Sequence, residues 1–264
     1  MKILNRAIYL FVFLLFVSSI GTAQQPTRLS DDEVKKVIVE ASKTSDKFRD
    51  AFKKVSFLTT KDGAQVDVQK FMSDYKDTFQ RFKDGFDSDK TPNSDLGNLF
   101  RMTGEIDGVM NRNPDAAGAG SEWQAHKFNM DRLAQAFHTS IAEDAPHARR
   151  MSDDQVKAIG QELQQASKSV GKSIKDAMKK DKSIDKGTLE ATEQSLKTLE
   201  KDAETLKKLI NDQKPLSVEM QNFLKQMDII KSFINEHSLG SAVQSQWDQL
   251  ESKASRLTGE YGIS

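Results

Sequence analysis

The feature that most constrains the fold of this chain is a pattern that occurs twice, 124 residues apart. Residues 121–137 read SEWQAHKFNMDRLAQAF, and residues 245–261 read SQWDQLESKASRLTGEY. Both stretches contain a Ser two positions before a Trp, then an Arg–Leu pair, and both end on an aromatic residue. A repeat of this length is far longer than a solenoid unit and long enough to form a domain with its own core. We therefore expect two domains built on one plan.

The beginnings of the two halves are also alike. One half contains LSDDEV from residue 29, and the other contains MSDDQV from residue 151. In each, a serine at a helix start is followed three residues later by a residue that can complete a capping box, Glu33 after Ser30 and Gln155 after Ser152. Acidic residues in the first turn favour the same helix start.

Apolar residues between these ends recur at steps of three and four, as in the buried face of a bundle helix. In the first half they are Met72, Tyr75, Phe79, Phe82, Phe86, Leu96, Leu99, Phe100, Ile106 and Met110. The residues 124 positions later are Leu196, Leu199, Ala203, Leu206, Ile210, Met220, Phe223, Leu224, Ile230 and Ile234. The pattern predicts helices over 30–57, 64–87, 94–112, 121–143, 152–181, 186–212, 216–237 and 241–260.

The predicted fold class is all-α, with two tandem up-and-down four-helix bundles that arose by internal duplication. Long helices with short polar connections are expected to lie antiparallel beside their neighbours. The first bundle is expected over residues 24–146 and the second over residues 147–264.

The first 23 residues have the features of a secretory signal peptide. Lys2 and Arg6 precede the apolar run Ala7–Ile20, and small residues precede Gln24. The alternative is a retained membrane anchor, but a span needs about 20 apolar residues. We expect cleavage, export to the periplasm or the medium, and no stable membrane span afterwards.

Composition excludes several classes of function. The chain has no cysteine, which excludes disulfides, thiolate chemistry and covalent haem attachment through Cys. Its formal net charge is zero, which disfavours a nucleic-acid partner. The exported chain must therefore be stabilised by burial of its apolar residues, and its length is sufficient for that.

The two halves differ in their aromatic content. The expected mature first half has ten Phe and the second half two. These rings are explained either as core residues or as the lining of a pocket for a small apolar ligand. The pocket hypothesis places Tyr75, Phe79, Phe82 and His126 at the site.

His126 is the other difference, because it occupies a helix position that the second half fills with Leu250. It is explained as a hydrogen-bonded histidine of the helix interface, or as a ligand to haem iron or another metal, with Met130 one turn away. Two neighbours on one helix could not occupy both axial positions of one haem. The chain has no Glu-x-x-His pair and no His-Glu-x-x-His motif. We assign no metal and no cofactor.

The sequence contains no phosphate-binding loop, dinucleotide fingerprint or nucleophile elbow, and we assign no catalytic residue. The expected architecture resembles that of exported four-helix-bundle cytochromes, without their covalent haem attachment. We expect a non-enzymatic exported protein that acts by binding a small apolar ligand or a protein partner, or by structural interaction. The alternatives are a non-covalent haem- or metal-binding bundle that uses His126, and a helical enzyme with a site dispersed over several helices.

Overall fold

The computed structural model describes residues 28–53, 57–59, 63, 65–87, 93–112, 114–141 and 150–263. The predicted signal peptide and residues 142–149, which connect the two halves, lie outside the described residues. Within the described residues the protein is almost entirely α-helical, with eight α-helices and one small hairpin. The fold class predicted from the periodicity is therefore confirmed at the level of helical bundles.

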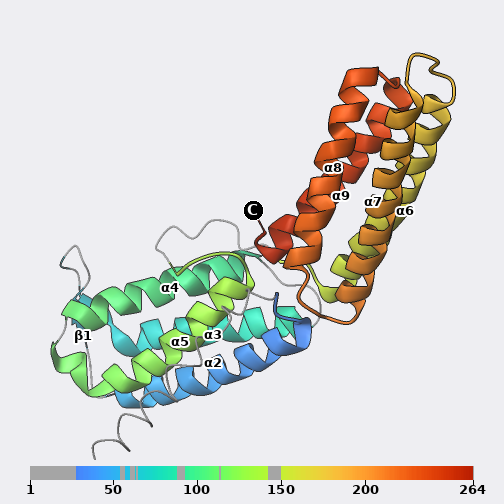
Figure 1. Cartoon of the computed structure of the whole chain (residues 1–264). Coiled ribbons are helices and arrows are strands. Elements are labelled where there is room, and N and C mark those ends of the chain that lie inside the picture. The colour runs from blue at the N-terminus through green and yellow to red at the C-terminus, as the bar shows by residue number, and fades with distance from the viewer. Residues whose placement is uncertain are drawn as a thin grey trace, which may run out of the picture.

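Residues up to 141 form one group of four helices, and residues from 150 form another (Figure 1). The first group consists of α2 (Asp31–Phe52), α3 (Val68–Asp87), α4 (Asn93–Arg112) and α5 (Gly120–Ala136), with strands β1 (Phe57–Thr59) and β2 (Gln65–Asp67) and the 3₁₀ helix η1 (Pro114–Ala119). The second group consists of α6 (Asp153–Met178), α7 (Lys186–Asn211), α8 (Ser217–His237) and α9 (Ser241–Tyr261).

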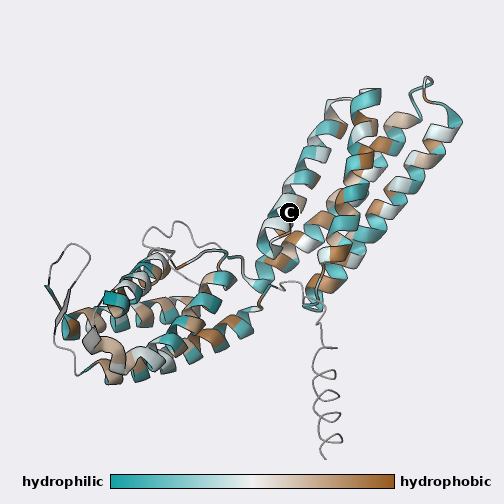
Figure 2. Ribbon diagram, turned by 60° about the vertical axis from the view of Figure 1, so that its left-hand side comes forward, coloured by the Kyte–Doolittle hydropathy of each residue, from teal (hydrophilic) through white to brown (hydrophobic). Residues whose placement is uncertain are grey.

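Each group packs as a ring of four helices. In the first group α2 contacts α3 and α5, and α4 contacts the same two helices. In the second group α6 contacts α7 and α9, and α8 contacts the same two helices. The buried residues of the helices are mostly apolar, and hydrophobic and hydrophilic residues recur along each helix ribbon (Figure 2). Each ring encloses its own hydrophobic core, so the described residues contain two separate cores.

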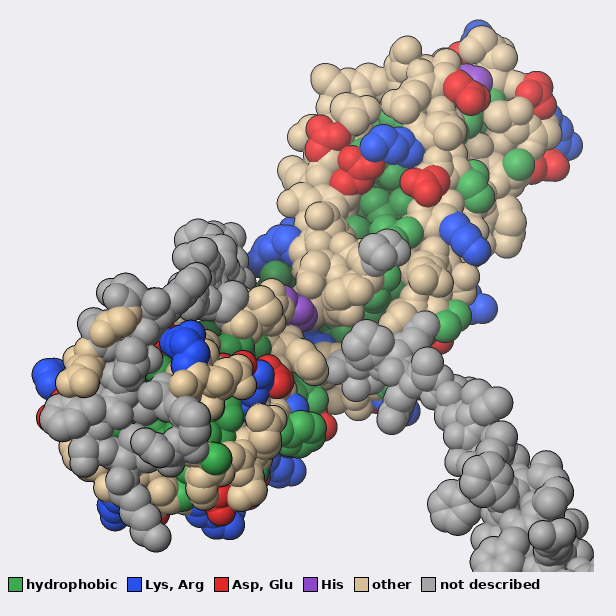
Figure 3. Space-filling model, turned by 90° about the vertical axis from the view of Figure 1, so that its left-hand side faces the viewer, with side chains coloured by type: hydrophobic (Ala, Val, Ile, Leu, Met, Phe, Trp, Pro, Cys, Tyr) green, Lys and Arg blue, Asp and Glu red, His purple; other side chains and the backbone are tan. Residues whose placement is uncertain are grey.

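The predicted apolar stripes form these cores. Among the second-helix residues of the first half, Tyr75 and Phe82 are fully buried and Phe79 is 4% exposed. Trp123 and Trp247, the tryptophans of the repeated pattern, are 1% and 0% exposed. Seen from one side, the second bundle also displays a strip of hydrophobic side chains flanked by charged ones (Figure 3).

Both predicted capping boxes are present. The Ser30 hydroxyl accepts a hydrogen bond from the Glu33 backbone N–H at 3.3 Å, and the Glu33 carboxylate accepts one from the Ser30 backbone N–H at 2.8 Å. Ser152 and Gln155 make the same reciprocal pair at 3.3 and 2.9 Å. These bonds satisfy backbone donors that have no partner within the helix.

The predicted helix over 30–57 is wrong at its end, because α2 stops at Phe52. The chain then forms β1, which pairs antiparallel with β2 in a two-stranded hairpin that the sequence reading missed. Gly63 lies between the strands with φ of +84°, a conformation that glycine adopts without strain. Helix α3 starts at Val68, later than predicted, and its first turn is capped by the Asp67 carboxylate.

The predicted helix over 121–143 is also too long, because α5 ends at Ala136. His138 has a left-handed φ of 52°, and the Thr139 backbone N–H bonds to the Ala134 carbonyl at 3.0 Å. This geometry is a Schellman motif, which ends a helix by satisfying its last carbonyls. Helix α9 ends in the same way, with Gly262 at the left-handed position, 124 residues after His138.

The two bundles meet at one end of each, where the starts of α2 and α6 and the end of α9 come together (Figure 1). Within the part of the chain that the structure describes, each helix is too short or too polar to cross a lipid bilayer.

Candidate functional site

His126 is fully buried in the first bundle, and both of its ring nitrogens contact protein side chains. Its Nδ1 lies 3.2 Å from the Thr44 hydroxyl on α2, and its Nε2 lies 2.6 Å from the Tyr75 hydroxyl on α3. Tyr75 also lies 3.0 Å from the Thr103 hydroxyl, which donates to the Leu99 carbonyl on α4 at 2.7 Å. A buried polar chain thus connects all four helices of the bundle.

The buried position of His126 keeps its imidazole neutral. Burial lowers the pKa of His126 to about 4, against a small opposing effect of a hydrogen bond with the Ala41 backbone. Burial also raises the pKa of the Tyr75 phenol, although the hydrogen bond with Thr103 opposes the change. At neutral pH the group is therefore a network of uncharged donors and acceptors.

The geometry does not present His126 as a ready metal ligand. A ligating imidazole needs one nitrogen lone pair directed at the metal, and here each nitrogen lies within hydrogen-bond distance of a side chain. Met130, the suggested second ligand, is fully buried in the core. In the described residues, no three His, Asp or Glu side chains are grouped so that they could hold a metal ion.

The four residues of the pocket hypothesis fall into two groups. Tyr75 contacts His126, with ring centroids 5.6 Å apart. Phe79 packs edge-on against Phe82 at 6.4 Å, and Phe82 packs against Phe137 at 5.9 Å. Rings at these separations fill space against one another. The arrangement supports the interpretation of the aromatic stripe as core.

A second polar group lies where the bundles meet. We call it the polar junction and define it as Arg28, Asp31, Arg150, Asp153 and Glu260. Arg28 and Arg150 are 6% and 3% exposed along their side chains, and Glu260 is 4% exposed, so these charges are largely removed from water. Charges in such a setting are stable only when they are paired and hydrogen-bonded.

The contacts of the junction are reciprocal. Arg28 donates to Asp153 Oδ1 at 2.5 Å and to the Met151 carbonyl. Arg150 donates to Asp31 and, at 2.7 Å, to the Leu29 carbonyl. Each arginine therefore binds the aspartate and the backbone of the other half. The two arginines are 122 residues apart in the sequence, and so are the two aspartates.

The two aspartates complete this symmetry. The backbone N–H of Asp31 donates to Asp153 Oδ2 at 3.0 Å, and the backbone N–H of Asp153 donates to Asp31 Oδ2 at 2.8 Å. Each carboxylate thus caps the first turn of the other half's first helix. The starts of α2 and α6 are related by an approximate two-fold axis that passes between them.

Glu260 breaks the symmetry. It accepts from Arg28 Nε at 2.7 Å and from the Met151 backbone N–H at 3.1 Å, and its partner in the first half is Ala136. The junction then has three carboxylates against two guanidinium groups. The N-termini of α2 and α6 each contribute roughly half a positive charge, which brings the sum near zero.

The pKa values follow from this balance. Burial by itself raises the pKa of Asp153 and Glu260, but hydrogen bonds and positive charge outweigh it, so both values lie below the usual range. For Asp153 the main partner is Arg28, and for Glu260 the partners are His138, Arg28 and the Met151 backbone. Burial and the charge of Arg28 lower the pKa of Arg150. The carboxyl groups of Asp153 and Glu260 therefore stay ionised beside Arg28 at neutral pH.

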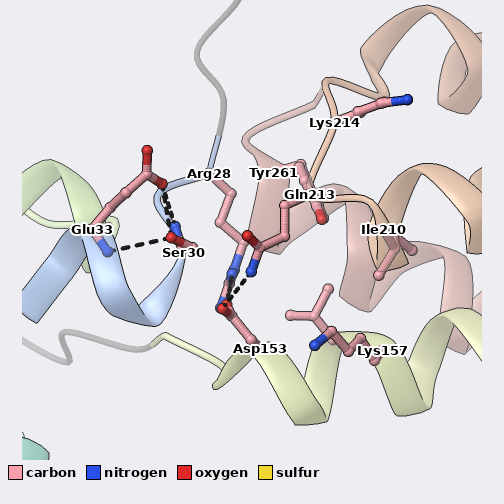
Figure 4. A pocket seen from close by; sticks show the side chains of 10 residues that line it. Arg28, Ser30, Glu33, Asp153, Lys157, Ile210, Gln213, Lys214 and Tyr261 are labelled. Carbon is pink, nitrogen blue, oxygen red and sulfur yellow. Dashed lines mark hydrogen bonds and ion pairs between the residues drawn. The ribbon is translucent and has the colours of Figure 1, made fainter.

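A small cavity of about 40 Å³ lies beside the junction (Figure 4). It is lined by Arg28, Ser30, Glu33, Asp153, Val156, Lys157, Ile210, Gln213, Lys214 and Tyr261. Gln213 also donates to Asp153 at 3.0 Å, and burial raises the pKa of Tyr261 to about 12. A cavity of this size holds a water-sized molecule but no organic ligand. The junction is a site of contact between bundles.

A larger groove of about 660 Å³ lies at the other end of the second bundle. It is formed by the end of α6, the loop from α8 to α9 and the start of α9, with Asp176, Lys180, Asp181 and His237 among its polar residues and Leu239 among its apolar ones. Its volume is within the range of small-molecule sites. His237, placed by the sequence at the end of a helix, is the last residue of α8.

The two tryptophans have different polar surroundings. Trp123 Nε1 donates to Asp107 at 2.9 Å, and Lys127 bonds to the other oxygen of that carboxylate at 2.7 Å. At the equivalent positions, 124 residues later, the second bundle has Lys231 paired with Glu251 at 2.8 Å. The ion pair is therefore reversed, and Trp247 Nε1 has no acceptor among the described residues.

The sequence reading found His126 and Tyr75 but missed the junction. Asp31 and Asp153 were explained as helix N-terminal charges, which is correct but incomplete. Arg28 and Arg150, each three residues before an aspartate, were the available signal, since both halves begin with Arg, an apolar residue, Ser and Asp.

Comparison with known proteins gives no relative: no protein-family model, no curated protein and no solved structure matches the chain. The function proposed below is therefore inferred from the side-chain contacts of this protein.

Proposed function

We propose that this protein is an exported, non-enzymatic helical-bundle protein that acts by binding or structural interaction. The observation that carries the proposal is that its buried polar groups form hydrogen bonds and ion pairs with one another. His126 and Tyr75 bond to each other, and the arginines of the polar junction bond to carboxylates of the opposite half. Groups arranged in this way stabilise a structure and hold it in one form.

We further propose that the two bundles arose by internal duplication, with a signal peptide over 1–23, a first domain over 24–146 and a second over 147–264. Three pairs of equivalent features support this: the capping boxes of α2 and α6, the Schellman motifs after α5 and α9, and the buried Trp123 and Trp247. The reversed ion pairs beside the tryptophans fit two copies that changed independently.

The polar junction supports a structural role for the relation between the bundles. Its bonds involve backbone groups at the starts of α2 and α6 and side chains from both halves, so they restrict rotation of one bundle against the other. Domains of one chain move relative to one another by default unless their interface is large and hydrophobic, so here the restraint comes from the paired charges. We infer that a partner meets both bundles in a fixed relative orientation.

The haem or metal alternative would require His126 to give up a bond that it makes to Tyr75 or Thr44. The alternative of an enzyme with a dispersed site would require several free titratable groups to converge. The groove at the end of the second bundle contains titratable groups, of which Asp181 accepts hydrogen bonds from Ser183. We infer from its open, mixed lining that the groove is a surface for a small ligand or a partner segment.

The experiment that tests the proposal is the purification of the exported chain from its own compartment. We expect the mature chain to begin at Gln24, to show no Soret band after expression with added haem, and to contain no stoichiometric metal. The matched control is His126→Leu, which copies the residue of the second bundle, Leu250. A Soret band or bound metal that disappears in this variant would contradict the proposal.

Ligand binding is tested by titration with the apolar fluorescent probe anilinonaphthalene sulfonate. If the groove binds apolar groups, saturable fluorescence is expected, and Ala242→Trp, which fills the groove from an exposed position, should abolish it. Phe79→Leu in the first bundle is the control and should leave the titration unchanged. A loss of binding in Phe79→Leu alone would instead favour the aromatic pocket around Tyr75 and Phe82.

A further inference from the structure

The polar junction has a property beyond holding two bundles together, because it is nearly self-complementary. Arg28 and Asp31 of one half contact Asp153 and Arg150 of the other, and the same residue types occupy the same positions in both halves. We propose that two copies of this chain associate through this junction. The first half of each copy then binds the second half of the other.

The argument rests on the geometry of two-fold contacts. In an isologous interface each partner offers the same patch, and a residue that contacts its counterpart on one side is contacted in return on the other. The junction meets this condition in its four central bonds, two from arginine side chains and two from backbone N–H groups. The start of α2 binds the start of α6 within one chain. It can make the same bonds to the start of α6 in another chain.

The buried charges make the open form of the chain unfavourable, and a second open chain can pair them again. When a half separates from its partner within the chain, Arg150 loses its bonds to Asp31 and the Leu29 carbonyl, and Arg28 loses Asp153 and Glu260. A second chain whose own junction is open restores the same set of bonds. Two exchanged chains contain two complete junctions, the same number as two closed monomers, so only the cost of association separates the two states.

Charge reversal in one half tests the proposal on the full-length chain. One variant combines Arg28→Asp with Asp31→Arg, and the other combines Arg150→Asp with Asp153→Arg. In either variant alone the junction within the chain brings like charges together. In an equimolar mixture, the reversed half of one variant brings opposite charges to the reversed half of the other variant. The two unchanged halves also bring opposite charges to each other. Every chain in the test also carries Glu260→Gln, so that the aspartate introduced at position 28 does not meet a buried carboxylate there. The control is the chain with all four charge changes, in which the arginine–aspartate pairs are restored within one molecule.

The readout is molar mass by light scattering after the two variants are refolded together, at a concentration where the wild-type chain is monomeric. We expect a twofold mass in the mixture, and a monomer for the chain with all four changes. A mixture that stays monomeric while that control folds would overturn the proposal. A dimer of the control at the same concentration would also overturn it, because its junction is complete without a second copy.

A second measurement avoids variants whose helix starts are weakened by an arginine. Wild-type chains with two different affinity tags are refolded together at increasing concentration and purified through one tag. We expect the other tag to be retained in proportion to the concentration at refolding, and Arg150→Ala to reduce that retention several-fold. No retention at any concentration would overturn the proposal. The result does not depend on the ligand, the localisation or the absence of catalysis proposed above.

Discussion

His126 should make the stability of the first bundle depend on pH in a range where few other groups titrate. In the folded chain burial lowers its pKa from 6.5 to about 4. In the unfolded chain the imidazole is solvated and keeps its ordinary pKa, so the unfolded state binds a proton first as the pH falls. Stability from this group is therefore fully present above pH 6.5 and is lost as the pH falls toward 4.

The magnitude follows from the two pKa values. Integrating the proton linkage from pH 7 to pH 5 gives a loss of about 2 kcal/mol in the free energy of unfolding. From pH 7 to pH 4 the loss is about 3 kcal/mol. The side chains that face the imidazole are Thr44, Tyr75, Phe48 and Trp123, none of which is charged in this range. Asp and Glu side chains titrate mainly below pH 5 and add little between the two pH values.

The assay is urea unfolding of a Trp247→Phe chain, followed by the fluorescence of Trp123, whose ring lies 5.9 Å from His126. The first bundle is then observed without the second. The same measurement on a chain that also carries His126→Leu is the control, since Thr44 and Tyr75 keep bonds to the Glu40 carbonyl and Thr103. An equal loss of stability between pH 7 and pH 5 in both chains would refute the reasoning.

Three further predictions concern the repeat and the junction. Lys231→Asp combined with Glu251→Lys should give Trp247 Nε1 the acceptor that Asp107 provides to Trp123, and raise the free energy of thermal unfolding by about 1 kcal/mol, whereas Lys231→Asp alone should lower it by opposing Glu251. His138→Gly should stabilise the first bundle by about 1 kcal/mol in urea titrations, because a left-handed φ is costly for a residue with a Cβ; a loss would show that the approach to Glu260 matters more. Arg150→Ala should loosen the two bundles, seen as a broader distance distribution in small-angle X-ray scattering with unchanged helix content by circular dichroism, and an identical distribution would show that the junction does not fix their orientation.

Several of the differences between the sequence reading and the structure concern the ends of helices. The sequence predicts core positions such as Met72, Leu99 and Leu206 correctly. A helix repeats every 3.6 residues, so its buried face can be recognised from apolar residues at steps of three and four. The ends of α2 and α5 were placed too late. The end of α5 depends on the left-handed His138, and a histidine gives no composition signal for that conformation. After α2 the chain forms β1, whose pairing with β2 joins residues further along the sequence.

The partners of His126 illustrate the same limit within a site. The periodicity placed the imidazole on the buried face of its helix, but Thr44 and Tyr75 are 82 and 51 residues away in the chain. Which side chains meet a buried group depends on the rotation and register of neighbouring helices, and these are set by packing over the whole core.

The sequence by itself determined that this chain is helical, that its helices have apolar faces at matching positions in two halves, and where capping boxes begin α2 and α6, because these features arise from interactions between residues a few positions apart. Only the tertiary structure decided that Arg28 and Arg150 bind across the two halves, that Asp31 and Asp153 cap each other's helices, and that the imidazole of the first bundle is fully bonded. Those contacts join groups more than fifty residues apart, and their geometry exists only when the bundles are folded and in contact.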